Sequence, residues 1–220
     1  MTRSAANSEP QPTYAFGEAL CERVRANLAA FVPETIAQPG LRRAAVALTL
    51  LPDEAGRGCF VLTRRHADLR SHAGQWALPG GRLEGSERAE EAARRELLEE
   101  VGLEVGEQAV LGRLDDFATR SRHLITPLVV WAGREAGRRL RPNPGEVEAA
   151  YRVPLAELDR PENPHLHFIP QSERPVLSLA LIGTRVFAPT AALLFQFREV
   201  ALHGRPTRVA HFEQPLFAWQ

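Results

Sequence analysis

Three glutamates spaced for one face of a helix are the residues of this sequence best suited to chemistry. Glu96, Glu99 and Glu100 stand at positions i, i+3 and i+4, so a helix brings their carboxylates together. Such carboxylates repel one another unless cations bind among them, and hard oxygen ligands suit Mg²⁺ or Mn²⁺. The spacing therefore predicts a divalent metal site. Glu87, about two and a half turns earlier, joins it only through an irregular helix start or a bridging metal or water.

The helix that carries these glutamates is predicted to run from Ser86 to Val101. Ser86 is a suitable N-cap, and Gly102 suits the left-handed residue that ends a helix. Leu97, Leu98 and Val101 point roughly away from the glutamates, and we expect them to pack against a sheet. The alternative is a solvated acidic face that neighbouring arginines balance, which is the usual role of a charge run.

The residues around the glutamates match a known pattern, GX5EX7REUXEEXGU, in which U is aliphatic. All nine specified positions are filled, by Gly81, Glu87, Arg95, Glu96, Leu97, Glu99, Glu100, Gly102 and Leu103. The segment resembles the Nudix box, and the resemblance implies a Nudix hydrolase that cleaves a pyrophosphate linkage. It also implies an α/β fold, namely an α/β/α sandwich with a mixed sheet and added N- and C-terminal helices.

The resemblance assigns roles to individual residues. The catalytic residues that it implies are Glu96, Glu99 and Arg95. The metal-binding residues that it implies are Glu96, Glu99, Glu100, Glu87 and Gly81. Glu99 and Glu100 would be the main ligands of Mg²⁺ or Mn²⁺, Glu96 a further ligand or the general base, and Arg95 the partner that holds the carboxylates. Glu146, in a later loop, is either another ligand or base or a plain loop carboxylate.

A second pattern lies just upstream of the box, in residues 61–81. It resembles the coenzyme A pyrophosphatase signature LLTXRSX3RX3GX3FPGG and departs from it at Val61, His66 and Leu78. The substrate-binding residues predicted here are Arg64, Arg65, Arg70, His72 and Gly80. The guanidinium groups of the arginines can bind phosphate oxygens in pairs of hydrogen bonds. The alternative to phosphate binding is a charged strand edge for the arginines and a loop-supporting hydrogen bond for the histidine.

The two resemblances together imply metal-dependent hydrolysis of coenzyme A or its thioesters to 3′,5′-ADP and 4′-phosphopantetheine. Two alternatives stay open. One is a Nudix pyrophosphatase that acts on ADP-ribose or another nucleoside diphosphate derivative. The other is a Nudix ligand sensor without catalysis, which the three box glutamates disfavour because a pure binder has no need for a full carboxylate cluster.

The remaining patterns outline a layered domain of helices packed on a sheet. They predict an amphipathic helix over 16–28, strands over 44–51, 59–63, 109–114, 124–131 and 176–182, and a closing helix over 190–203. Pro127 predicts an edge position or a bulge in its strand, and the prolines of 160–175 predict a surface excursion. We expect a flexible tail at 1–14 and a single Nudix hydrolase domain at 15–220.

The composition of the 220 residues argues against several classes of protein. Twenty-seven basic and 27 acidic side chains cancel, which does not support nucleic-acid binding, and the apolar runs are too short to span a membrane. The absence of lysine excludes Schiff-base and P-loop lysine chemistry. The two cysteines, Cys21 and Cys59, form no disulfide framework and fit a cytoplasmic location. We expect a small-molecule substrate and leave a homodimer open.

Overall fold

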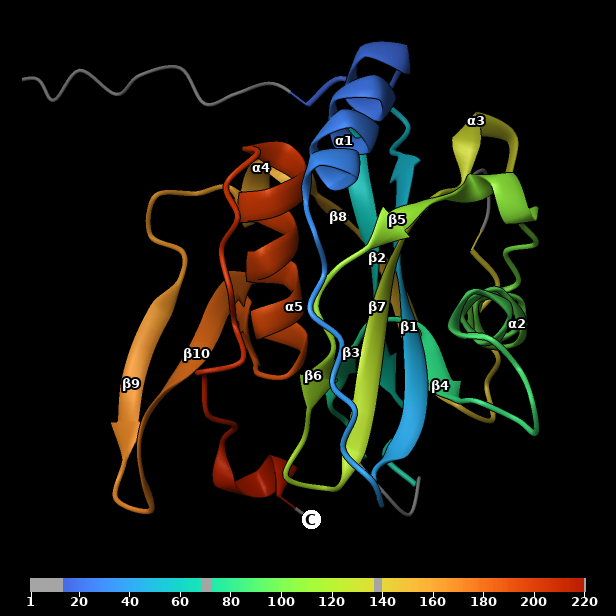
Figure 1. Cartoon of the computed structure of the whole chain (residues 1–220). Helices are drawn as coiled ribbons and strands as arrows, with labels where there is room; N and C mark the ends of the chain where they lie inside the picture. The colour runs from blue at the N-terminus through green and yellow to red at the C-terminus, as the bar shows by residue number, and fades with distance from the viewer. Residues whose placement is uncertain (1–13, 69–72, 137–139, 220) are drawn as a thin grey trace, which may run out of the picture.

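The centre of the molecule is a mixed β-sheet (Figure 1). The structure is a computed structural model that describes residues 14–68, 73–136 and 140–219. Within these residues, eight strands run in the order β3-β2-β1-β7-β5, with β4 paired to β1, β6 to β7 and β8 to β2. Their bounds are β1 Arg42–Pro52, β2 Gly58–Arg65, β3 Trp76–Ala77, β4 Gly80–Arg82, β5 Val110–Arg113, β6 Phe117–Ala118, β7 His123–Trp131 and β8 Val147–Pro154.

The long strands β1, β2 and β7 form the middle of this sheet. β1 and β7 run parallel from the Arg42–His123 pair to the Leu50–Trp131 pair. β1 and β2 pair antiparallel with Leu50 across from Phe60, so the predicted hairpin is confirmed. The inner strand positions are apolar and buried on both faces, as covered sheets require.

Pro127 lies in an inner strand, so the predicted edge position is wrong. β7 has β1 on one side and both β5 and β6 on the other. The segment paired with β7 advances four residues, from Arg113 on β5 to Phe117 on β6. Over the same length β7 advances only three residues, from Leu128 to Ile125. Residues 114–116 therefore lie opposite only Thr126 and Pro127, which confirms the alternative of a bulge, since proline has no N–H to offer a regular ladder.

Helices cover both faces of the sheet (Figure 1). α2 (Ala89–Val101) packs on one face through the fully buried Ala92, Ala93, Leu97 and Val101. α1 (Glu18–Ala30) and α5 (Thr190–Phe197) lie on the other face, where the larger apolar core gathers. The expected sandwich with a mixed sheet is therefore confirmed. Leu98 differs from its prediction, because it is 48% exposed.

The start of α2 differs from the prediction, and its end agrees with it. The N-cap is Arg88, whose backbone N–H donates to the Glu91 carboxylate, so Ser86 as N-cap is wrong. Residues 84–87 instead form a turn, which the Glu87 carboxylate closes by accepting the Glu84 backbone N–H at 3.0 Å. Gly102 ends the helix with φ 69° and ψ 23°, the left-handed conformation that glycine tolerates best.

Tyr14, predicted as the last residue of the tail, packs into the domain. Tyr14 is buried, and its hydroxyl donates to Asp159 Oδ2 at 2.7 Å. The predicted N-terminal helix is confirmed as α1, which buries Leu20, Val24 and Leu28 against the core. Residues 1–13 lie outside the described residues.

A second, three-stranded sheet follows in the order β11-β10-β9. Its strands are β9 His165–Ile169, β10 Ser172–Leu181 and β11 Thr184–Phe187. The proline-rich stretch thus contains a β-hairpin, and its β9 residues are partly or largely exposed, so the predicted surface excursion is confirmed and has a regular form. The closing helix is confirmed as α5 and a π-helical turn over Arg198–Leu202.

Short helical turns complete the described chain. They are η1 Glu107–Ala109, α3 Gly133–Ala136, α4 Leu155–Leu158 and η3 Leu216–Ala218. In the described part of the chain, every helix is too short or too polar to span a membrane.

Candidate active site

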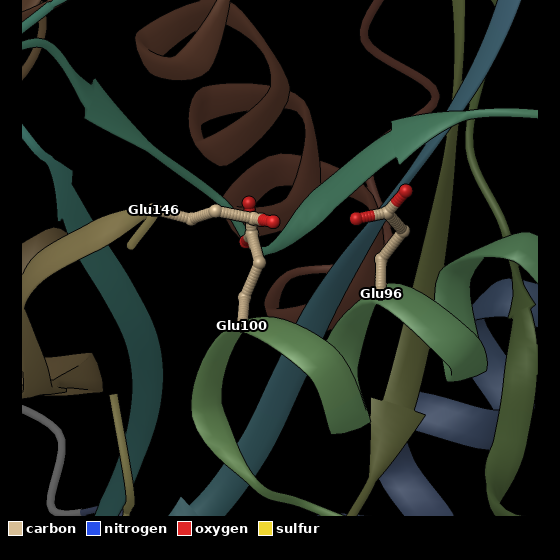
Figure 2. Close-up of side chains that lie close together, drawn as sticks. All are labelled: Glu96, Glu100 and Glu146. Carbon is tan, nitrogen blue, oxygen red and sulfur yellow. The ribbon is translucent and has the colours of Figure 1, made fainter. Parts of the chain in front are cut away.

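Three carboxylates from two parts of the chain meet beside the main sheet (Figure 2). Glu96 and Glu100 come from successive turns of α2, and Glu146 comes from the loop before β8. One oxygen of each lies within 4.8 Å of the others. We call this group the carboxylate cluster.

Backbone hydrogen bonds bring the loop of Glu146 to the end of α2. The Asn143 N–H donates to the Glu100 carbonyl at 2.9 Å, and the Glu146 N–H donates to the Asn143 carbonyl at 3.0 Å. The Glu146 carbonyl in turn accepts the His66 N–H at 2.9 Å, next to the end of β2. These bonds satisfy carbonyls at the helix end and fix the loop between α2 and β2.

Burial makes the carboxylate cluster electrostatically unfavourable without cations. Glu100 is only 2% exposed, and this desolvation raises its pKa to about 7, although Arg65 and the Gly80 N–H oppose the shift. Desolvation also raises the pKa of the half-buried Glu96, against the opposing effect of Arg95. Glu146 adds to both shifts by charge repulsion.

Arg95 holds the carboxylates beside this cluster. Its Nε and Nη2 donate to both oxygens of Glu87, each at 3.0 Å, and these bonds lower the pKa of Glu87. Its Nη1 donates to Glu96 Oε1 and to Glu99 Oε2, each at 2.9 Å. A single guanidinium therefore connects three of the predicted site glutamates.

Glu99 lies outside the carboxylate cluster. Its side chain is 51% exposed and forms an ion pair with Arg95. Glu87 is likewise paired with Arg95 and is tied to the turn before α2. Metal binding by Glu99 and Glu87 stays a prediction.

The glycines before α2 allow a close approach of backbone and carboxylate. Gly80 lies on β4 with φ 159°, and its N–H donates to Glu100 Oε2 at 3.2 Å. A Cβ on Gly80 would lie 2.3 Å from the Ala45 carbonyl oxygen, and one on Gly81 would lie 2.0 Å from Glu96 Oε1. Neither position has room for a side chain.

A cavity of about 1040 Å³ opens over the carboxylate cluster. Of the predicted substrate-binding residues, Arg65 and Gly80 line it, and Arg65 Nη1 lies 3.4 Å from Glu100 Oε1. Arg64 is not among the lining residues and pairs with Glu148 at 3.4 Å. Arg70 and His72 lie outside the described residues.

Only one of the arginines that line this cavity, Arg65, was predicted from the sequence. Besides Arg65, the lining arginines are Arg42, Arg82, Arg120, Arg122 and Arg185. They come from β1, β4, the turn between β6 and β7, and β11. Their spacing along the chain therefore does not indicate that they share a cavity. Glu96, Glu100 and Glu146 are the carboxylates among the described lining residues, which leaves six arginines facing three glutamates.

The residues present fit a divalent metal. The carboxylate cluster supplies hard oxygen ligands, which Mg²⁺ and Mn²⁺ prefer, and a bound cation would offset the repulsion among its buried charges. Gly81, the predicted additional ligand, lies on β4 next to the cluster and could bind the metal only through its backbone carbonyl.

This chain is similar to several known proteins of one family. A NUDIX domain model matches residues 40–172. The uncharacterized Nudix hydrolase NudL of Photorhabdus laumondii is 39% identical over 117 residues, which cover 53% of this chain and 60% of that protein. The mitochondrial coenzyme A diphosphatase NUDT8 of Homo sapiens is 30% identical over 164 residues, which cover 72% of this chain and 66% of that protein.

A solved MutT/nudix family protein from Enterococcus faecalis is also similar, with 18% identity and a TM-score of 0.46, over 71% of this chain and 53% of that chain. The chain spans about half the length of the curated relatives it matches, from 43% to 66% in four of them. The family model covers more than half of the chain and includes the box, the carboxylate cluster and most of the sheet. The chain therefore belongs to the Nudix family.

Proposed function

We propose that this chain hydrolyses a diphosphate linkage with the help of Mg²⁺ or Mn²⁺. The observation that carries the proposal is the carboxylate cluster of the buried Glu100 with the partly buried Glu96 and Glu146, which lines a large cavity in a chain of the Nudix family. A divalent metal bound there would supply Lewis acidity and neutralise charge on the diphosphate oxygens.

The residues of the chain have separate tasks in this reaction. Water attacks one phosphorus of the diphosphate, the bond from that phosphorus to the bridging oxygen breaks, and two phosphate monoesters leave. A carboxylate accepts the proton of the water, and Glu96 is the proposed base because it reaches the cavity and lies at the cluster. Arg95 fixes Glu96 in place, and Arg65 contacts both the cavity and Glu100.

For the substrate we propose coenzyme A or one of its thioesters, with 3′,5′-ADP and 4′-phosphopantetheine as products. The upstream signature and the relative named as a coenzyme A diphosphatase support this choice. The excess of arginines over glutamates in the cavity also supports it, because coenzyme A carries a 3′-phosphate in addition to its diphosphate. ADP-ribose, which lacks that phosphate, is the alternative substrate.

The test compares coenzyme A with its 3′-dephospho form and with ADP-ribose, in Mg²⁺, in Mn²⁺ and in chelator. The proposal predicts metal-dependent release of 3′,5′-ADP and a kcat/KM for coenzyme A at least about tenfold above the other two, since an arginine–phosphate contact is a strong, charge-assisted hydrogen bond. Equal values for coenzyme A and its dephospho form would contradict the substrate assignment. Metal-dependent binding of all three without turnover would favour a sensor.

A further inference from the structure

Residues 213–219, which match no pattern in the sequence, form part of the wall of the catalytic cavity. Gln214, Phe217, Ala218 and Trp219 line the same cavity as Glu96 and the rest of the carboxylate cluster. Figure 1 shows this red end of the chain beside the turn between β6 and β7. We call residues 213–219 the wall segment.

A buried ion pair attaches the wall segment to the main sheet. Glu213 is 1% exposed and accepts from Arg120 Nε at 3.1 Å and from Arg120 Nη2 at 2.5 Å. Glu213 also accepts the Ser172 hydroxyl at 2.9 Å, and its backbone N–H donates to the Pro175 carbonyl at 2.8 Å. Because all of these groups are satisfied, the segment has a fixed place beside the cavity.

The aromatic side chains of the wall segment are held in that place. The Trp219 indole N–H donates to the Gln214 carbonyl at 2.9 Å, and the Arg120 guanidinium lies 4.8 Å from the centre of the indole ring. Phe217 meets the ring of Phe187 edge-on at 5.6 Å. Phe217 is nevertheless 50% exposed, so it offers apolar surface to the cavity.

The cavity therefore joins two chemically different regions. The carboxylate cluster suits metal ions and the diphosphate, whereas Phe187, Phe217 and Trp219 form an apolar surface in the same cavity. Apolar surface of this kind gains free energy by removing an organic group from water, and it gains nothing from a bare phosphate. Phosphates have the lining arginines as partners instead.

We propose that Phe217 and Trp219 determine substrate specificity by contacting one organic group of the substrate, so that the chain prefers diphosphates with an organic group on each phosphorus. This inference rests on the proposed hydrolysis and adds the residues that choose its substrate. Glu213 is a positioning residue, because it acts through the wall segment and does not line the cavity.

The test measures KM and kcat for coenzyme A and ADP-ribose, each of which has two organic groups. In the Trp219→Ala and Phe217→Ala proteins we expect KM to rise about tenfold over wild type and kcat to stay within about twofold of it. The lost contact stabilises the bound substrate and the transition state equally, so its loss weakens binding without slowing the chemical step. Leu216→Ala is the matched control. Leu216 is 44% exposed on the same turn but does not line the cavity, so its KM should stay at the wild-type value.

Two further readouts separate substrate contact from a general loss of structure. The inhibition constant of inorganic pyrophosphate, which has no organic group, should be the same in wild type and Trp219→Ala. Glu213→Gln should raise KM with kcat unchanged, as Trp219→Ala does, whereas a merely destabilised protein would lose active fraction and so lower the apparent kcat.

The outcomes distinguish this inference from the proposed function. Hydrolysis by wild type with equal KM in Trp219→Ala, Phe217→Ala and Leu216→Ala would overturn the inference and leave the function standing. Absence of hydrolysis by wild type would contradict the function, and calorimetric binding of coenzyme A would then decide the inference. Weaker binding in Trp219→Ala but not in Leu216→Ala supports it, and equal binding in all three proteins overturns it.

Discussion

Gly81 lies directly against the carboxylate of Glu96. A Cβ on Gly81 would lie 2.0 Å from Glu96 Oε1 and 2.4 Å from Glu96 Cδ. The space that a side chain would fill at Gly81 is thus occupied by a member of the carboxylate cluster. The first glycine of the box and its first α2 glutamate are therefore one structural unit, although 15 positions separate them along the chain.

Gly81→Ala should displace Glu96 and lower hydrolysis by at least about tenfold, because misplacing a reacting group by about 1 Å is enough to cost that much. The three heavy atoms nearest the new methyl group all belong to the end of the Glu96 side chain, which can move, so the unfolding free energy should fall by only about 1 kcal/mol. Gly17→Ala is the control, because nothing lies within 4 Å of a Cβ at Gly17. Full activity in Gly81→Ala would contradict this account.

Arg95→Lys should also reduce hydrolysis, by about tenfold or more, since one ammonium group cannot reproduce the guanidinium contacts to Glu87, Glu96 and Glu99. The rate should be measured over a series of Mn²⁺ concentrations, because loosened carboxylates are expected to weaken metal binding. Arg94→Lys is the control, since Arg94 donates to the Val105 carbonyl and touches none of these glutamates. Equal rates in the two variants would argue against a positioning role for Arg95.

Glu146→Gln should weaken metal activation, because the change removes one of the three charges of the carboxylate cluster. We expect the Mn²⁺ concentration for half-maximal rate to rise about tenfold. Glu148→Gln changes a glutamate two residues away that pairs with Arg64 outside the cavity, and it should leave this concentration unchanged. If both variants behave as wild type, Glu146 is the plain loop carboxylate that the sequence left open.

The sequence predicted the α2 part of the site well because that part is local. A helix places i and i+4 on one face whatever surrounds it, so Glu96 and Glu100 had to lie together, and Gly102 had to end the helix. The N-cap was less predictable, because the carboxylate of Glu87 closes a turn over residues 84–87 and the helix begins only after Arg88. Serine propensity at Ser86 was overridden by that contact.

The rest of the site depends on contacts between distant segments. Glu146 reaches the cluster through hydrogen bonds to the end of α2, and Arg120 reaches the cavity because it pairs with Glu213. Neither contact leaves a periodic signal in the chain. Arg64 and Arg65 illustrate the limit as well, since neighbouring strand residues point to opposite faces and the sequence alone did not say which arginine faces the cavity.

The stability of the wall segment should depend on pH through Glu213. Hydrogen bonds from Arg120 lower the pKa of Glu213 to about 2, below its value in the unfolded chain. A lowered folded-state pKa adds stability that is present above the unfolded pKa and is lost as pH falls through the folded pKa. The ion pair should therefore stabilise wild type above about pH 4.5 and cease to do so near pH 2.

This dependence is measured as the difference in unfolding free energy between wild type and Glu213→Gln. We expect a difference of about 1–3 kcal/mol at pH 6, because removing one partner leaves Arg120 unpaired while solvent screens its exposed side. The difference should shrink steadily from pH 5 to pH 2. Glu173→Gln, at an exposed site on β10, should show no such trend, and a flat difference in Glu213→Gln would refute the assignment.

The proposed metal-dependent hydrolysis depends above all on the carboxylate cluster of Glu96, Glu100 and Glu146. The most direct measurement is the release of 3′,5′-ADP from coenzyme A by wild type, Glu100→Gln and the exposed-site control Glu104→Gln, in Mn²⁺ and in chelator. Glutamine can still accept the Gly80 N–H, so mainly the buried charge is lost. We predict that Glu100→Gln lowers the rate at least about 100-fold, as chelator does for wild type, and that Glu104→Gln has no effect. A wild-type rate in Glu100→Gln, or turnover that chelator leaves intact, would contradict the account.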